Sequence, residues 1–99
     1  MALHFDPVIK SFRHKGIERF FRTGNAAGIQ PHHAGKLRLM LGALDHAGTE
    51  KDMNVAGWRL HRLSGKHQGF WSVTVSGNWR LIFRFDGTDA ELVDYLDYH

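Results

Sequence analysis

The chain ends on Asp94-Tyr95-Leu96-Asp97-Tyr98-His99, which places a carboxylate, a phenol and an imidazole in the last three residues. Histidine is the side chain whose charge changes near neutral pH, and a neighbouring carboxylate can orient it or hold it charged. The three side chains are therefore suited to acid–base chemistry. The alternative is an ordinary edge strand in which the tyrosines pack and the polar side chains are solvated. The hexapeptide alone does not separate the two interpretations.

The composition describes one small domain. The chain has 99 residues, of which 42% are hydrophobic, and it includes three Trp and seven Phe. Such a chain can bury one core but is too short for two domains. Cysteine is absent, which excludes disulfides and thiolate metal sites and fits a reducing compartment. Because no signal peptide and no apolar run of membrane-spanning length is present, we expect a soluble cytoplasmic protein.

The net charge of +3 is unevenly distributed. All 13 Lys and Arg residues lie between Lys10 and Arg84, where only four carboxylates oppose them. Residues 85–99 carry five carboxylates and no Lys or Arg. A basic body suits a polyanion, because Lys and Arg supply most of the sequence-independent affinity for nucleic acid. Modest positive charge also serves solubility, so charge alone does not establish nucleic-acid binding.

The first half of the chain predicts a strand and two helices. Residues 8–12 are expected to form a short strand. Apolar residues at helical spacing predict one helix over residues 14–23 and a second that begins near Pro31 and ends near Gly48.

In the second half of the chain apolar and polar residues alternate, which predicts four strands. Their expected ranges are 58–63, 70–76, 79–85 and 90–98. Gly77-Asn78 is typical of a two-residue hairpin, and Asp86-Gly87-Thr88 supplies the next turn. Short turns make neighbouring strands antiparallel. The result is an α+β domain, in which the helices cover one face of a four-stranded meander.

The other face of this sheet is expected to gather basic side chains. Alternation along the third strand of the meander turns Arg80 and Arg84 away from the apolar side chains. On its first strand Arg59 and His61 share one side. We expect these residues to meet the polar end of the last strand on one concave surface. A solvated outer face is the alternative, because strand register is not readable from sequence.

Five blocks of the sequence together resemble the HigB branch of the RelE-like toxin family. The blocks are Ile9–Gly16, Trp58–His61, Gly69–Val73, Gly77–Phe85 and Asp94–His99. They occur in the family's order with similar spacings, so the resemblance implies a single RelE-like domain over residues 1–99. Residues 1–7 precede the family's usual start and are interpreted as an N-terminal extension.

The resemblance implies the toxic half of a type II toxin–antitoxin pair. Such toxins are ribosome-dependent endoribonucleases that enter the decoding site and cut messenger RNA. A HigA-type helix-turn-helix antitoxin holds them inactive in a hetero-oligomer. The family's functional positions, carried over residue by residue, are His61, Arg80, Asp97, Tyr98 and His99.

One segment departs from the family's pattern. The family commonly reads Leu-His-Pro-Leu-Lys-Gly where this chain has Arg62 in place of the proline and Ser64 in place of the lysine. We expect Lys66 to substitute for the missing basic side chain. The residues expected to bind RNA are Arg59, Arg62, Lys66 and Arg84.

The implied chemistry needs no metal or cofactor, because RNA carries its own nucleophile. The 2′-hydroxyl attacks the adjacent phosphate and expels the 5′-oxygen, leaving a 2′,3′-cyclic phosphate. His61 and His99 suit the two proton transfers, and Arg80 suits the crowded phosphate. Asp97 is expected to orient an imidazole, and Tyr98 to donate to phosphate or stack on a base. Which histidine is the base stays open.

Two alternatives to catalysis by these residues are open. A degenerate toxin that only binds antitoxin or RNA would carry nearly the same sequence, and Ser64 is the residue that favours it. A histidine metal site would need a third ligand beside His61 and His67, and the chain has no His-Glu-x-x-His motif.

The outer face of the second helix is also basic. It carries His32, His33, Lys36 and Arg38, which we expect to be solvated or to meet an acidic partner. An antitoxin that docks there would leave the sheet face uncovered. Direct occlusion of the catalytic histidines is the alternative.

Overall fold

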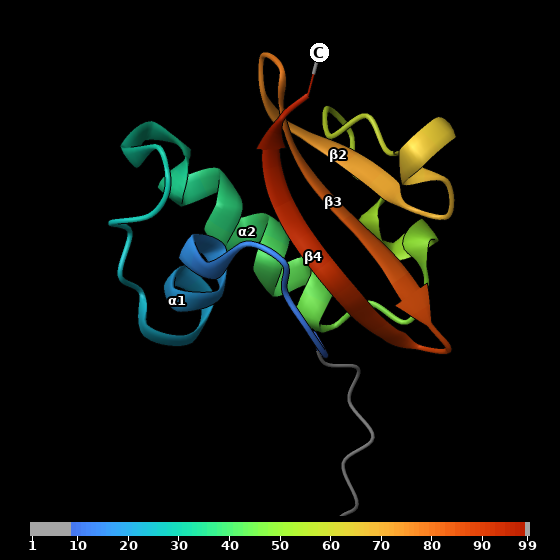
Figure 1. The fold of residues 1–99 in the computed structure, drawn as a ribbon, viewed down its shortest axis with the longest axis horizontal. Coiled ribbons are helices and arrows are strands. Elements are labelled where there is room, and N and C mark those ends of the chain that lie inside the picture. Colours follow the sequence, from blue (N-terminus) through green and yellow to red (C-terminus); the bar gives the residue numbers. More distant parts are fainter. Residues whose placement is uncertain (1–8, 99) are drawn as a thin grey trace, which may run out of the picture.

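The computed structural model describes residues 9–98, which form a pair of helices packed on one antiparallel sheet (Figure 1). The helices are α1 (Lys15–Thr23) and α2 (Ala34–Asp45), with short 3-10 turns η1 (Pro31–His33), η2 (Glu50–Met53) and η3 (Gly65–His67). The strands are β1 (His61–Arg62), β2 (Trp71–Ser76), β3 (Trp79–Asp86) and β4 (Asp89–Asp97). The expected N-terminal extension and His99 lie outside the described residues. No helix within residues 9–98 is long and apolar enough to cross a membrane.

Local capping sets the bounds of α1. The Nδ1 of His14 accepts a hydrogen bond of 3.0 Å from the backbone N–H of Ile17, so His14 caps the helix instead of opening it. Gly24 takes the left-handed φ of 82° at the other end, as expected for a helix stop.

The stop predicted for α2 at Gly48 lies two residues too late, because the observed C-cap is His46. The helix ends at Asp45, and the N–H of His46 donates back to carbonyl groups of the last turn. The N–H of Gly48 instead donates to Asp52 Oδ2 at 2.9 Å, where Thr49 and Asp52 form a reciprocal cap on η2. The polar cap of the next turn therefore competes successfully for the backbone that would have continued the helix.

The predicted four-stranded meander is confirmed, with strand order β1-β2-β3-β4 and every pair antiparallel. β1 is much shorter than the predicted strand over residues 58–63, because Arg59 takes a left-handed φ of 56° that interrupts extended backbone. The predicted first strand is reduced to two isolated parallel bridges, from Ile9 to Ala90 and from Phe12 to Val93. The N-terminal segment thus runs beside β4 without forming a regular strand in the described chain.

The main core lies between the helices and the sheet. The predicted helical spacing is confirmed, since the α2 side chains Leu37, Met40, Leu41 and Leu44 are all buried. They meet apolar side chains on one face of the sheet, among them Val73, Leu81, Phe83 and Val93. Burying such side chains stabilises the fold by roughly 1.5–3 kcal/mol each.

A second, smaller core covers the opposite face of the sheet, which we call the open face. It consists of Leu63, Phe70 and Ile82, with Leu92, Leu96 and Tyr98 packed against them. Leu63 and Phe70 flank η3, and the N–H of Leu63 donates to the carbonyl of Phe70 at 2.9 Å. The loop between β1 and β2 therefore packs on the face of the sheet where the sequence predicted basic side chains and no covering segment.

Replacing Gly28 with Ala should destabilise the protein. A Cβ at Gly28 would lie 2.7 Å from the Cα of Gly16, so the start of α1 and this loop must separate. We expect a loss of about 1–3 kcal/mol, the range for overpacking.

A Cβ at Gly42 in α2 meets nothing within 4 Å, so Gly42→Ala should stabilise by about 0.5–1 kcal/mol. Urea unfolding measures both changes, and a Gly28→Ala protein as stable as wild type would contradict the close approach.

Candidate active site

Strand register places His61 on the open face. His61 pairs with Ser72, Ser72 with Ile82, and Ile82 with Asp94, so these four residues form one row across the sheet. Directly paired residues project to the same side of a sheet. Ile82 belongs to the core on the open face, which places the exposed His61 there as well.

Arg80 and Tyr98 occupy the next positions along the open face. Arg80 pairs with Thr74 and Leu96, and the N–H of Tyr98 donates to the carbonyl of Asn78 at 2.8 Å. Sheet spacings put the Cα atoms of Arg80 about 12 Å from His61 and about 8 Å from Tyr98. The three residues therefore share one face of the sheet, with the position of Tyr98 nearer to Arg80 than that of His61.

The guanidinium of Arg80 is fixed by the hairpin beside it. Its Nη1 donates to the carbonyl of Gly77 at 2.6 Å and to that of Trp79 at 3.3 Å. Its Nε is buried and has no hydrogen-bond partner within residues 9–98. A buried donor without an acceptor is costly, and guanidinium donors suit the oxygens of a phosphate. The Nε is closed to solvent in this conformation, so an anion reaches it only when neighbouring groups move.

The structure does not bring Asp97 together with these residues. Asp97 pairs with Trp79, whose ring packs against the main core on the helical side. Alternation along β4 therefore directs Asp97 and Tyr98 to opposite sides of the sheet. The predicted convergence of the C-terminal side chains is not seen for this pair, and His99 lies outside the described residues.

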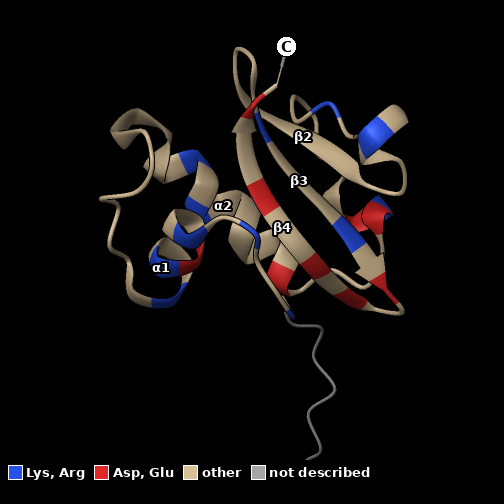
Figure 2. Cartoon of the chain, viewed as in Figure 1, with Lys and Arg blue, Asp and Glu red and all other residues tan. Residues whose placement is uncertain are grey.

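The four side chains expected to bind RNA are dispersed. Arg62 projects to the other side from His61, with its guanidinium 5.6 Å from the Trp71 ring centre. The Nε of Arg84 forms an ion pair of 2.6 Å with Glu91, so its charge is largely compensated. Arg59 and Lys66 are exposed in the loops around β1 and η3. Figure 2 shows acidic residues of β4 beside the basic residues of β3.

His67 joins the site through a contact that the sequence did not predict. Its ring centre lies 5.6 Å from that of Tyr98 and 6.2 Å from that of Phe70, in edge-to-face geometry. Its Nδ1 is buried without a hydrogen-bond partner in the described chain. The guanidinium of Arg13 covers Phe70 at 5.0 Å. The sequence did not predict this contact because the residues of η3, which turn His67 back over the sheet, show no regular spacing of apolar side chains.

A metal site based on His61 and His67 would need a third ligand close to both side chains. Within residues 9–98 no three His, Cys, Asp or Glu side chains come together in a way that could hold a metal ion.

A buried polar contact supports the strand that carries the C-terminal residues. The Nδ1 of His33 and the hydroxyl of Tyr95 form a hydrogen bond of 2.7 Å, and Tyr95 stacks on Trp79 with ring centres 4.7 Å apart. His33 is only 2% exposed, so the expectation that it is solvated or faces a partner is wrong. Burial, followed by the neighbouring His32, lowers the pKa of His33. Burial also raises the pKa of Tyr95.

The chain is similar to known proteins over nearly its whole length. The profile of the RelE-like toxins of the type II toxin–antitoxin system HigB matches residues 10–99. A curated protein from Proteus vulgaris named Endoribonuclease HigB is 38% identical over 92 residues. That match covers 93% of this chain and 100% of the Proteus protein. All five functional positions taken from the family resemblance fall inside the range of the profile.

The buried His33 should make stability depend on pH. Its pKa is lowered in the folded state, so in acid the unfolded chain binds a proton that the folded protein does not. Its contribution to the free energy of unfolding is therefore complete above the ordinary histidine pKa of about 6.5. This contribution should fall as the pH drops below that value and level off beneath the lowered folded-state pKa.

Urea unfolding of wild type and His33→Gln between pH 5 and 8 measures this dependence. The difference in unfolding free energy between the two proteins should shrink toward acid pH. His46→Gln, at an exposed position, is the control for a histidine substitution outside the core. A constant difference between wild type and His33→Gln would show that His33 does not titrate differently on folding.

Proposed function

The chain belongs to the RelE-like toxins of the HigB type, and from this membership we propose that it is an endoribonuclease toxin that cuts messenger RNA on the ribosome. The resemblance read from the five sequence blocks is confirmed by the profile match over residues 10–99. The two-layer α+β architecture is the one expected for RelE-like toxins.

The arrangement of Arg80 is the observation that carries the proposal. Its guanidinium is anchored by two backbone carbonyls and keeps a buried Nε free of partners in the described residues. It lies on the face that also carries His61 and Tyr98. A preoriented cation stabilises charge that develops in a transition state, without reorganising at the moment of reaction. The pentacoordinate phosphorane formed during RNA cleavage carries such a developing charge on its oxygens.

The remaining side chains supply the proton transfers. A histidine takes the proton of the 2′-hydroxyl as the bond from the 2′-oxygen to phosphorus forms. The bond from phosphorus to the 5′-oxygen then breaks, and the second histidine protonates the departing oxygen. We assign these roles to His61 and His99 without fixing their order, and we place Tyr98 against the phosphate or a base.

The openness of the site favours dependence on the ribosome. His61 is exposed, and its Nδ1 lies 3.3 Å from the carbonyl oxygen of Arg59. No hydrogen bond within residues 9–98 joins His61 to Arg80. RNA bound to this face alone would therefore be weakly oriented, whereas the decoding site holds messenger RNA in one conformation. Proximity and orientation are worth several orders of magnitude in rate.

We further propose that the partner is a HigA-type helix-turn-helix antitoxin in a toxin–antitoxin hetero-oligomer, and that the protein acts in the cytoplasm, where ribosomes are. Family membership supports an antitoxin partner of a type II system.

The loss of the family lysine at Ser64 does not by itself indicate a degenerate toxin. Ser64 is exposed just before η3, and its carbonyl accepts the N–H of His67 at 3.3 Å. Lys66 lies exposed on the same turn and can bring a positive charge to the same RNA backbone. Mapping RNA ends after induced expression separates the two cases. Cuts within translated codons support catalysis, and growth arrest without cuts supports binding alone.

Arg80→Ala should lower cleavage of ribosome-bound messenger RNA by about 100-fold or more, the usual effect of removing a donor that stabilises a transition state. Arg80→Lys should restore little of it, because an ammonium cannot reproduce the planar fork. His61→Ala and deletion of His99 should each cost about 10²–10⁴ in rate. Primer extension on programmed ribosomes measures these rates. Arg19→Ala on α1 is the control, and full activity of Arg80→Ala would remove Arg80 from the mechanism.

A substrate with a 2′-deoxy group at the scissile nucleotide should bind but not be cut. The nucleophile is then missing, while the phosphate and bases remain in place. Products of the normal RNA should end in a cyclic or 3′-phosphate, and a chelator should not slow cleavage while the ribosomes stay intact. Cutting of the deoxy substrate at the normal rate would replace this mechanism by attack of water or hydroxide.

A further inference from the structure

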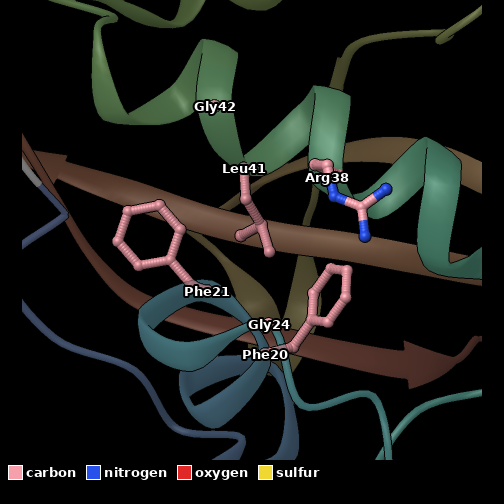
Figure 3. Close-up of a pocket in the computed structure, with 6 residues that line it drawn as sticks. All are labelled: Phe20, Phe21, Gly24, Arg38, Leu41 and Gly42. Atoms are coloured by element: carbon pink, nitrogen blue, oxygen red, sulfur yellow. The ribbon is translucent and has the colours of Figure 1, made fainter.

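A cavity of about 330 Å³ opens between α1 and α2, on the helical layer of the protein (Figure 3). Its lining residues are Phe20, Phe21, Gly24, Arg38, Leu41 and Gly42. The helices cover the sheet face opposite the one that carries His61 and Arg80 (Figure 1). The mechanism proposed above therefore makes no use of this cavity.

Two glycines leave the room for it. Gly24 ends α1 in the left-handed conformation, and Gly42 lies inside α2, where glycine costs about 0.5–1 kcal/mol of stability relative to alanine. A Cβ built on either glycine meets nothing within 4 Å. The hollow is thus open space above packed helices and not a fault in the core. Ordinary side chains at these positions would fill it.

The rim of the cavity is basic. The Arg38 guanidinium lies 5.5 Å from the Phe20 ring centre, and no carboxylate pairs with Arg38 within residues 9–98. Arg22, one residue after Phe21, is partly compensated by Glu18 at 3.2 Å. Leu39, the neighbour of Arg38 on α2, is 68% exposed. Figure 2 shows basic residues on both helices. The cavity therefore combines an apolar hollow with a positive charge at its rim that has no carboxylate partner within residues 9–98, and Leu39 adds exposed apolar area on the same helix.

These features match one kind of partner segment. A bulky apolar side chain would be buried against Phe20, Phe21 and Leu41, and neighbouring carboxylates would meet Arg38. Interfaces of this kind are usually anchored by a few buried side chains surrounded by complementary charge. A nucleic acid fits less well, because the edges of a base would find few hydrogen-bond partners on these walls.

We infer that this cavity is the anchor point of the antitoxin, which inserts a bulky apolar side chain from an acidic segment between α1 and α2. The inference rests on the proposed function, which supplies the antitoxin as a partner. The inference also limits the antitoxin-binding surface expected on the second helix to fewer residues. His33 is buried at the N-terminus of α2, so the interaction centres on Arg38 and the cavity beside it.

Filling the cavity tests the inference without weakening the fold. Gly42→Leu should place its side chain in the hollow, with wild-type or higher thermal stability because a helix former replaces glycine. The dissociation constant for the purified cognate antitoxin should rise at least tenfold, measured by titration calorimetry. Cleavage of ribosome-bound RNA by the free variant should match wild type, since the open face is untouched.

Gly35→Leu is the matched control. It is the same change on the same helix, a Cβ there meets nothing within 4 Å, and Gly35 does not line the cavity. Its affinity for the antitoxin should stay within twofold of wild type. Arg38→Glu tests the charge separately. It should also raise the dissociation constant at least tenfold, and its affinity should depend less steeply on salt than that of wild type.

The outcomes separate this inference from the proposed function. Unchanged antitoxin affinity in Gly42→Leu overturns it, as does an equal loss of affinity in Gly35→Leu. If Gly42→Leu weakens ribosome binding and not antitoxin binding, the cavity serves ribosomal RNA and the inference is wrong. If Gly42→Leu loses thermal stability, the Arg38→Glu variant becomes the test. Unchanged affinity of Arg38→Glu for the antitoxin then overturns the inference. A wild-type protein that binds antitoxin through the cavity but cuts no RNA would remove the proposed function alone.

Discussion

The structure depends on β3 being buried on both of its faces. Leu81 and Phe83 face the helices, whereas Ile82 faces the second core on the open side of the sheet, and all three are 0% exposed. Slipping the strand by one residue would exchange these faces, placing Arg80 in the main core and Leu81 in the second. Double-sided burial therefore fixes the register of both neighbouring strands. That register decides which polar side chains share the open face.

The second core determines how the candidate site is built. Leu63 and Phe70 hold the ends of the loop that carries η3, so His67 is packed against Tyr98. The polar groups lie around this apolar patch and not across a flat strand surface. Arg80 lies on this same face, and its buried Nε has no hydrogen-bond partner in the described chain. Leaving one such donor unpaired costs about 1–3 kcal/mol.

Sequence alone predicted the features that depend on local chemistry. The stop at Gly24 and the hairpin at Gly77-Asn78 follow from neighbouring residues, and both are present. The missed features depend on contacts between distant residues. Strand alternation already places Asp97 and Tyr98 on opposite sides of the sheet. The burial of His33 requires Tyr95, 62 positions away, and the choice of Tyr98 over Asp97 for the open face requires the pairing with β3. No local pattern reports either contact, so the grouping of the site residues was only partly predictable.

The helix α2 connects the two layers of the molecule. Its N-terminal cap residue, His33, bonds the hydroxyl of Tyr95, which stacks on Trp79 directly before Arg80 in the chain. Tyr95 precedes Asp97 by two residues on β4. The helix whose far side borders the cavity at Gly42 thus also anchors the strands that present the candidate catalytic groups. A partner bound to α2 would therefore contact the layer that supports these strands while leaving the open face uncovered.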